Sequence, residues 1–316
     1  MTGHKQAILD LQWSRDSEVI FSASADMSVA SWNLETGMRL RKHIGHEEVI
    51  NCLDISKRGQ ELLLSGSDDG YIGIWDPRQK AAVDFIDTRF PVTAVALSEA
   101  GNEIYSGGID NDIKVWDARK QQVIYTLRGH TDTITSLEIS PDSQILLSNS
   151  HDSTVRTWDI RPFAPVDRSI RTYDGAPTGL EKNLIRASWD VKGEKICAGA
   201  GDRTVVIWDA RSGKLLYKLP GHNAVVNDVR FSPSEEPISK FNRFSTPNFS
   251  DQCFQSSPGP QTANFYLANL ASDAKPGDKV RPPLHTAGRL PWAEVSAGTA
   301  FHRALVVTWK RACSYF

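Results

Sequence analysis

The sequence has little cysteine and no long apolar run. Its four cysteines are Cys52, Cys197, Cys253 and Cys313, and none stands at the spacing of a metal site or of a disulfide framework. An amino-terminal apolar stretch typical of a signal peptide is also missing. No stretch approaches the roughly 20 apolar residues that cross a bilayer. These absences predict a protein of a reducing compartment with no membrane partner.

An excess of charge of one sign is missing too. The chain has 36 Lys and Arg against 38 Asp and Glu, and its last part, residues 233–316, holds nine and six of them. The preceding part is therefore mildly acidic, and it has no basic stripe with interleaved aromatics, which argues against direct RNA contact. Glycine-rich phosphate loops and metal-ligand clusters are absent as well. We therefore expect no enzyme activity, no metal or other cofactor, and no small-molecule substrate.

What the chain does contain is a repeat, seen best in residues 129–159, GHTDTITSLEISPDSQILLSNSHDSTVRTWD. Apolar and polar residues alternate over 134–140, 145–148 and 154–158, and turn residues separate these runs. A fourth alternating run, 123–127, precedes the Gly-His pair. Alternation with a period of two residues predicts half-buried β-strands.

The repeat recurs along the chain with a fixed signature. Its tryptophans are Trp32, Trp75, Trp116, Trp158 and Trp208, and an Asp lies six residues before each of them. Gly-His pairs open units at residues 3, 45, 129 and 221. A period near forty residues with four strands is typical of the WD40 repeat, in which each unit forms one blade of a β-propeller. The predicted fold class is therefore an all-β WD40 propeller.

The polar residues of each unit predict a buried hydrogen-bond network. The turn Asp can accept from the His ring, the His can donate to a Ser four residues before the Asp, and the Ser can donate to the Trp indole. The candidates in chain order are His4, Ser22, Asp26, Trp32, His46, Ser65, Asp69, Trp75, Ser106, Asp110, Trp116, His130, Ser148, Asp152, Trp158, Asp202 and Trp208. Ser, His and Asp also form hydrolase triads. A constellation that recurs in several units is architectural, so we assign no catalytic residue.

Two units depart from the signature. The third has Asp87-Thr88 in place of Gly-His, and losing one net hydrogen bond should weaken its network by about 0.5–1.5 kcal/mol. The fifth has Leu180 where His would stand and Ala198 where Ser would stand. Both network members are lost together there, and we expect Trp189 to join the strand packing instead.

The fourth unit carries an insertion after its Trp-Asp pair. Residues 161–165, Arg-Pro-Phe-Ala-Pro, should be stiff and extended because each proline fixes its own φ and restricts the preceding residue. Residues 169–173 can still form the outer strand, and a long loop follows over 174–183. Phe163 could cap the end of the blade or belong to a binding epitope, and both interpretations remain open.

The repeat pattern stops after the start of a sixth unit. Gly221-His222 and the run 225–232 open this unit, but no second strand, turn Asp or Trp-Asp pair follows. Residues 233–316 hold nine of the sixteen prolines and show no period. We therefore predict a propeller region, 1–232, with five complete blades and the first strand of a sixth, and an irregular tail, 233–316. The blades should form an open arc.

Several segments resemble the WD40-repeat subunit of the U5 small nuclear ribonucleoprotein. These are GGIDNDIKVWD at 107–117, TWDIRPFAP at 157–165, EKNL at 181–184 and LLYKLPGH at 215–222. The resemblance covers about residues 3–232. It implies a nuclear, non-enzymatic scaffold in pre-mRNA splicing, with spliceosomal proteins as partners and the large central U5 protein as the chief one. That family has seven blades, so we expect the sequence to represent a truncated or misspliced form with an incomplete ring.

An alternative function rests on arginines that follow the Trp-Asp pairs. Arg78, Arg119, Arg161 and Arg211 each stand two residues after the Asp, which resembles the box by which WD40 substrate receptors dock on cullin-RING ubiquitin ligases. Such an Arg can also close a strand end and pair with a nearby acid, for about 0–1 kcal/mol. These four arginines and Phe163 are the candidate partner-binding residues.

Overall fold

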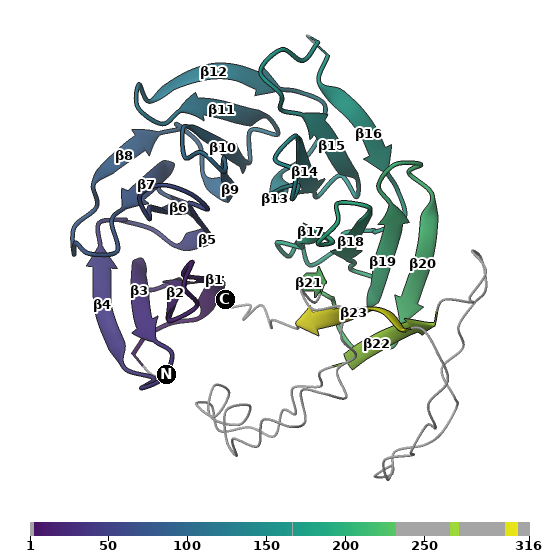
Figure 1. Cartoon of the computed structure of the whole chain (residues 1–316), viewed down its shortest axis with the longest axis horizontal. Coiled ribbons are helices and arrows are strands. Elements are labelled where there is room, and N and C mark those ends of the chain that lie inside the picture. Colours follow the sequence, from purple (N-terminus) through teal and green to yellow (C-terminus); the bar gives the residue numbers. More distant parts are fainter. Residues whose placement is uncertain (1–2, 166, 232–265, 272–300, 309–316) are drawn as a thin grey trace.

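The fold is built of strands arranged around an arc (Figure 1). The computed structural model describes residues 3–165, 167–231, 266–271 and 301–308. Within these ranges no helix is long and apolar enough to cross a membrane. Five sheets of four antiparallel strands follow one another along the chain, and each sheet is one blade. This confirms the predicted all-β propeller architecture with five complete blades.

Each blade runs from an inner to an outer strand in chain order (Figure 1). Blade 1 contains β1 (Ile8–Trp13), β2 (Val19–Ser24), β3 (Ser28–Asn33) and β4 (Arg39–Ile44). Blade 2 contains β5 (Ile50–Ile55), β6 (Leu63–Ser67), β7 (Tyr71–Trp75) and β8 (Asp84–Asp87), and blade 3 contains β9 (Val92–Leu97), β10 (Glu103–Gly108), β11 (Ile113–Asp117) and β12 (Gln122–Leu127). Blade 4 contains β13 (Ile134–Ile139), β14 (Ile145–Ser150), β15 (Val155–Asp159) and β16 (Ser169–Tyr173). Blade 5 contains β17 (Ala187–Trp189), β18 (Lys195–Gly199), β19 (Thr204–Asp209) and β20 (Leu215–Pro220).

A sixth sheet differs from the expectation of an irregular tail. The first strand of the sixth unit, β21 (Asp228–Phe231), pairs with β23 (Phe301–Thr308), and β23 pairs with β22 (Tyr266–Ala271). Two segments between 233 and 316 therefore form strands, although no repeat signature marks them. Backbone pairing needs no signature, because any extended segment can complete an open strand edge. The rest of the expected tail lies outside the described residues.

The turn between the second and third strands has one geometry in all five blades. The residue after the turn Asp has a positive φ each time: Met27, Gly70, Asn111, Ser153 and Arg203. The Asp side chain accepts from the amide two residues further on in several of these turns, for example from Thr154 to Asp152 at 2.8 Å. Such a bond offsets part of the strain of a left-handed non-glycine residue. The turn therefore holds the carboxylate at a fixed place at the end of the blade.

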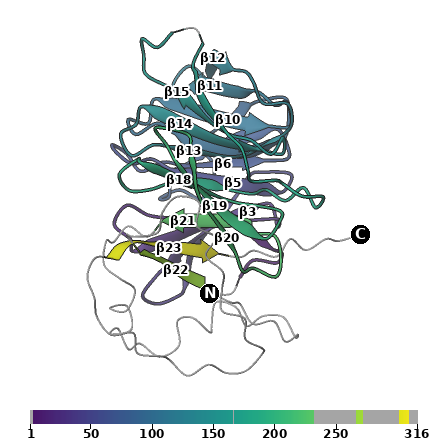
Figure 2. The same ribbon diagram turned by 90° about the vertical axis from the view of Figure 1, so that its right-hand side faces the viewer.

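The core lies between the blades, not within them. One cluster joins Phe21 and Val29 of blade 1 to Leu53 and Trp75 of blade 2. The clusters between the later blades combine residues of two neighbours in the same way. Inner strands contact one another in sequence around the arc, and Figure 2 shows the sheets stacked on each other. Each blade therefore depends on its neighbours for burial of its apolar faces.

Blade 1 has a face on which no other blade of the described residues packs. Leu53 of β5 is 2% exposed and Leu97 of β9 is 2% exposed, because each inner strand packs on the blade before it. In β1 the corresponding apolar residues Leu11 and Trp13 are 50% and 53% exposed. Figure 1 shows the described strands as an open arc, with β1 at one end and the sheet of β21, β23 and β22 at the other.

The position of a residue in the arc should decide its contribution to stability. Leu53→Ala removes a fully buried side chain, and we expect it to lower the free energy of unfolding by about 2–5 kcal/mol. Leu11→Ala changes a half-exposed side chain and should cost about 0.5 kcal/mol. Urea denaturation monitored by tryptophan fluorescence measures both. Equal losses would contradict an uncovered face on blade 1.

Candidate functional site

Three blades contain the complete polar network. In blade 2 the Trp75 indole N–H donates to Ser65 Oγ at 2.7 Å, Ser65 Oγ lies 2.7 Å from His46 Nε2, and His46 Nδ1 lies 2.7 Å from Asp69 Oδ2. The same contacts join His4, Ser22, Asp26 and Trp32 in blade 1, and His130, Ser148, Asp152 and Trp158 in blade 4. The structure therefore brings these sequence-predicted residues together.

The direction of the network differs from the expectation that Ser donates to the indole. An indole nitrogen is a donor only, so Trp75 must donate to Ser65. With Nδ1–H of His46 donating to Asp69, the Ser65 hydroxyl donates to Nε2. The order of donation is then Trp, Ser, His and Asp, and every proton in the chain has an acceptor. The network ends on a carboxylate, which accepts without needing to donate.

The carboxylates at the ends of these networks are stabilised as anions. Burial alone would raise the pKa of Asp26, but hydrogen bonds from Ser28, the Lys5 amide and His4 outweigh it and lower the pKa to about 2. Asp69 and Asp152 show the same balance, and their pKa values also lie below the ordinary range. Hydrogen bonds to the charged form cause the lowering, so the network depends on an ionised Asp.

Blades 3 and 5 lack the His, and a lysine takes its place on the Asp. Lys114 of β11 lies 2.6 Å from Asp110, and Lys218 of β20 lies 2.7 Å from Asp202. The indole of Trp116 still donates to Ser106 at 2.8 Å. Asp110 and Asp202 are therefore paired, but among the described residues no chain of hydrogen bonds joins them to the Trp of their own blade, as happens in the complete networks. Sequence reasoning missed both lysines because they come from different strands of the repeat.

The fifth blade satisfies its Trp in a different way. The Trp208 indole donates to the backbone carbonyl of Asp174 at 2.9 Å, because Ala198 offers no hydroxyl. Trp189, in β17, is buried among the apolar residues of blades 4 and 5, as expected. Asp202 and Trp208 therefore belong to no common network, although both stand at the signature positions.

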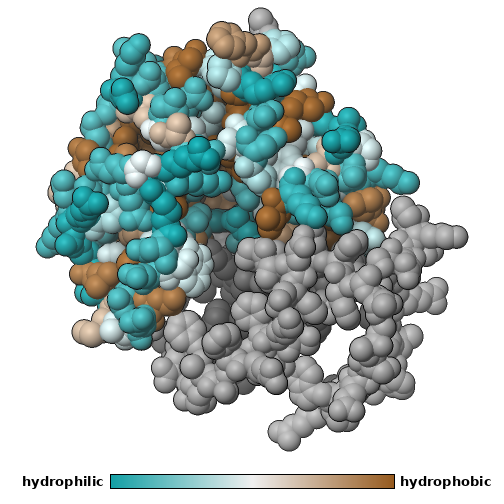
Figure 3. Space-filling view, in the orientation of Figure 1, coloured by the Kyte–Doolittle hydropathy of each residue, from teal (hydrophilic) through white to brown (hydrophobic). Residues whose placement is uncertain are grey.

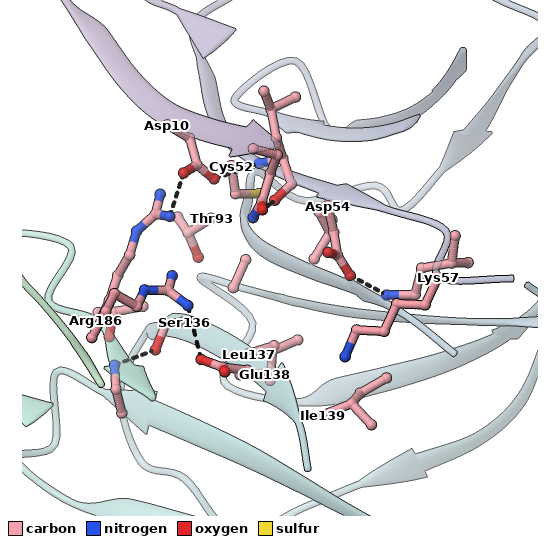
Figure 4. Close-up of a pocket in the computed structure, with 18 residues that line it drawn as sticks. Asp10, Cys52, Asp54, Lys57, Thr93, Ser136, Leu137, Glu138, Ile139 and Arg186 are labelled. Atoms are coloured by element: carbon pink, nitrogen blue, oxygen red, sulfur yellow. Dashed lines mark hydrogen bonds and ion pairs between the residues drawn. The ribbon is translucent and has the colours of Figure 1, made fainter. Parts of the chain in front are cut away.

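Charged residues meet in the central channel of the arc (Figure 4). A cavity of about 150 Å³ is lined by the inner strands, and Arg186 reaches from just before β17 to Asp10 of β1, 2.5 Å away. Asp10 also accepts from the Leu53 amide at 2.7 Å. Arg230, which also lines the cavity, pairs with Glu138 at 3.0 Å. These ion pairs connect strands that are far apart in the sequence. No pattern within a single repeat could have predicted them.

The channel also holds a carboxyl group with a raised pKa. Burial raises the pKa of Asp54 in β5 to about 6, against the opposing effect of the amides of Leu97 and Ile55, which donate to it at 2.7 and 2.9 Å. Nowhere in the described ranges do three or more His, Cys, Asp or Glu side chains gather as metal ligands would. Burial raises the pKa of Glu138 in the same cavity as well, so the channel combines paired charges with carboxyl groups that hold their protons more tightly than usual.

The four strand-end arginines lie at equivalent positions and are exposed. The amides of Arg78 and Arg119 each donate to the Asp two residues earlier at 2.9 Å, which closes the strand end. Arg161 adds an ion pair to Asp159 at 2.5 Å, and its side chain is 60% exposed. Each arginine follows the third strand of its blade. All four therefore lie on one face of the arc of blades, and neighbouring arginines are separated by the width of a blade.

Two loop residues are fully exposed. Phe163 is 100% exposed, so it does not cap the end of blade 4. Leu180, in the loop between β16 and β17, is 102% exposed. In the orientation of Figure 3 the hydrophobic residues of the described part form separate small groups among hydrophilic ones. Isolated apolar residues are common on protein surfaces and do not by themselves indicate a binding site. Phe163 and Leu180 are candidates for contact with a partner because their side chains are completely exposed.

The complete networks should contribute more stability than the incomplete ones. Asp152→Ala leaves buried donors of His130 and Thr154 without their acceptor, and should lower the free energy of unfolding by about 1–3 kcal/mol. Asp202→Ala removes a surface pair with Lys218 and should cost less. Chemical denaturation at neutral pH compares the two. Equal losses would show that the His-containing network adds nothing.

The raised pKa of Asp54 predicts a pH dependence of stability. Its folded pKa of about 6 lies above the unfolded value near 3.9, so the folded state binds this proton more tightly. The contribution is complete below about pH 4 and is lost as the pH rises through about 6. Wild type should therefore lose stability relative to Asp54→Asn between pH 4 and 7 in urea denaturation. The exposed Glu35→Gln variant is the control, and a constant wild-type-to-Asn difference would contradict the prediction.

Comparisons with known proteins agree with the geometry. The family described as Nucleolar protein 10-like, N-terminal domain, a β-propeller, matches residues 6–272. The pre-mRNA-splicing factor cwf17 of Schizosaccharomyces pombe is 45% identical over 238 residues, which are 75% of this chain and 70% of the relative. The U5 small nuclear ribonucleoprotein 40 kDa protein of Dictyostelium discoideum is 44% identical over 240 residues, covering 76% and 68%.

The human U5 small nuclear ribonucleoprotein 40 kDa protein is similar over a shorter span. It is 46% identical over 204 residues, which are 65% of this chain and 57% of the relative. The chain belongs to the WD40 β-propeller family of the U5 small nuclear ribonucleoprotein 40 kDa protein and cwf17.

Proposed function

We propose that this protein is a non-enzymatic interaction scaffold of the U5 small nuclear ribonucleoprotein and acts in pre-mRNA splicing in the nucleus. The observation that carries the proposal is the 44–46% identity to the U5 40 kDa proteins and cwf17 over 204–240 residues. At this identity the blade surfaces as well as the core are expected to correspond. The chain spans 57–70% of the length of these relatives.

The chemistry of the blades supports a role without catalysis. The serines that stand beside a histidine, such as Ser65, are buried and already accept from a tryptophan indole. A nucleophile must reach a substrate, and these hydroxyls cannot. The channel carboxylates Asp10 and Glu138 are paired with arginines. The fully exposed Phe163 and Leu180 lie on loops, where protein partners are often contacted.

The partners follow from the same family. We propose spliceosomal proteins, and chiefly the large central protein of the U5 particle, with direct RNA contact minor or absent. The cullin-RING receptor alternative rests on Arg78, Arg119, Arg161 and Arg211. The amides of three of them close strand ends on the preceding Asp, which accounts for the Trp-Asp-X-Arg pattern without a partner. The splicing names of the relatives do not favour this alternative.

Affinity purification tests the proposal. The tagged chain, incubated in nuclear extract that is competent for splicing, should recover U5 proteins identified by mass spectrometry. A variant with Leu53→Ala and Asp152→Ala is the matched control, because it disturbs the blades and should lose recovery. Charge reversal of the four strand-end arginines should leave recovery of U5 proteins in place.

A different set of recovered proteins would contradict the proposal. Recovery of a ligase adaptor and a cullin without splicing proteins would support the receptor function and overturn the scaffold proposal. Loss of the adaptor upon charge reversal of the four arginines would then identify these side chains as the contact.

A further inference from the structure

The insertion of the fourth repeat, between β15 and β16, projects from blade 4. Both views show this loop extending beyond the strands of the blade (Figures 1 and 2). Its apolar part is Pro-Phe-Ala-Pro at 162–165, in which Phe163 is 100% exposed and both prolines are exposed. The fold therefore buries none of the Phe163 ring, although burial of such a ring is favourable. We call residues 162–165 the Phe163 turn.

The Phe163 turn is not the stiff, extended run that its prolines predict. The Ala164 amide donates to the Arg161 carbonyl at 3.2 Å, which closes a β-turn over residues 161–164. Pro162 is the second residue of this turn, where its fixed φ is favourable. Phe163 follows it and stands at the corner of the turn. The ring is therefore presented by a backbone that has little freedom left to lose on binding.

Arg168 ties the base of the Phe163 turn to two blades. Its side chain donates to the carbonyls of Asp159 and Arg161 at 3.1 and 3.0 Å. The same guanidinium lies over the ring of Tyr125 in β12 of blade 3, with its central carbon 4.1 Å from the ring centre. The Asp159 amide in turn donates to the Arg168 carbonyl at 2.8 Å. Arg168 therefore positions the turn relative to the outer strands of blades 3 and 4.

The tip of the Phe163 turn is uncharged, and the arginines at its base are engaged. Residues 162–165 contain no ionisable side chain. Arg161 pairs with Asp159 at 2.5 Å, and Arg168 donates to two backbone carbonyls. A nucleic acid that stacks on an exposed aromatic ring also needs cations for its phosphates. An uncharged Pro-Phe-Ala-Pro tip therefore fits an apolar pocket of a protein better than it fits a nucleic acid.

We infer that the Phe163 turn is a docking anchor, which inserts the Phe163 ring into an apolar pocket of a partner protein. Pro162 and Pro165 pack on the rim of that pocket, and Arg168 is a positioning residue that keeps the turn in place. Aromatic side chains that enter a pocket of the partner dominate the binding energy of many interfaces, and a preorganised loop lowers the cost of binding. The inference rests on the proposed function as an interaction scaffold and names the chemistry of one of its contacts.

Site-specific photocrosslinking tests the anchor. The full chain carries a photoreactive diazirine analogue of phenylalanine at position 163 and is irradiated in nuclear extract that is competent for splicing. We expect a crosslink to one protein, which mass spectrometry maps to a segment rich in apolar residues. The same analogue at Met38, which is 68% exposed in the loop between β3 and β4, is the matched control and should give no such product.

Competition by unlabelled chains measures the strength of the contact. Phe163→Ala should need about tenfold or more higher concentration than wild type to suppress the crosslink. Arg168→Gln keeps the ring but releases the base of the turn, and should need about threefold or more. Met38→Ala should compete as wild type does. Phe163→Ala should keep the melting temperature of wild type because the ring is fully exposed, and melting temperatures identify any variant that fails to fold.

Four outcomes would overturn the inference. The first is the absence of a crosslink from position 163, and the second is equal competition by wild type and Phe163→Ala. A crosslinked product that ribonuclease removes would assign the ring to nucleic acid. A crosslink to a second copy of this chain would assign it to self-association.

The combined results separate this inference from the proposed function. If U5 proteins are recovered from extract but position 163 crosslinks to no protein, the scaffold proposal stands and the anchor inference is wrong. If position 163 crosslinks to a protein in a Phe163-dependent way but no splicing protein is recovered, the anchor inference stands and the proposed function is wrong.

Discussion

The blades depend on one requirement, that the buried indole N–H of each third-strand tryptophan must find an acceptor. Blades 1, 2 and 4 meet it with Ser, and the Ser is oriented by His and Asp in turn. Blade 3 keeps the Ser but has no His, and blade 5 uses the backbone carbonyl of Asp174. An unmet donor costs more than any single bond contributes, so the acceptor can change while the tryptophan stays. This explains how a degenerate repeat can still fold as a blade.

The contacts that could be predicted from the sequence are those of the complete tryptophan networks. The His, Ser, Asp and Trp of a full repeat recur at fixed offsets, so their contacts follow from the period alone. Lys114 and Lys218 replace the His on the Asp but come from β11 and β20, so no single offset reveals them. The Asp10–Arg186 pair joins residues 176 positions apart, and only the curvature of the arc brings them together. Contacts within one repeat can be predicted from its sequence, whereas contacts between distant blades cannot.

The blades form a one-dimensional stack, and a blade at the end of the stack buries less apolar surface than a blade in its interior. Leu53 and Leu97 are buried because a blade precedes theirs, while Leu11 and Trp13 are half exposed. The repeat pattern of the sequence ends with strand β21, but strand pairing continues from it to β23 and β22. Apolar periodicity predicts strands that pack on a neighbour on both sides. It is a weaker guide to strands whose role is to complete an open edge.

Satisfaction of the buried polar groups also limits where function can lie. The network serines and histidines are used by the blades, and the channel arginines are used by carboxylates, so partner contacts are left to the turns on the two faces. Trp189 of β17 differs from these residues, since its buried indole N–H has no acceptor among the described residues. The other tryptophan networks show that this fold supplies an acceptor to an indole by several routes. The acceptor can therefore vary from blade to blade while the buried core stays the same, and the exposed turns and loops are the part of the surface left for partners.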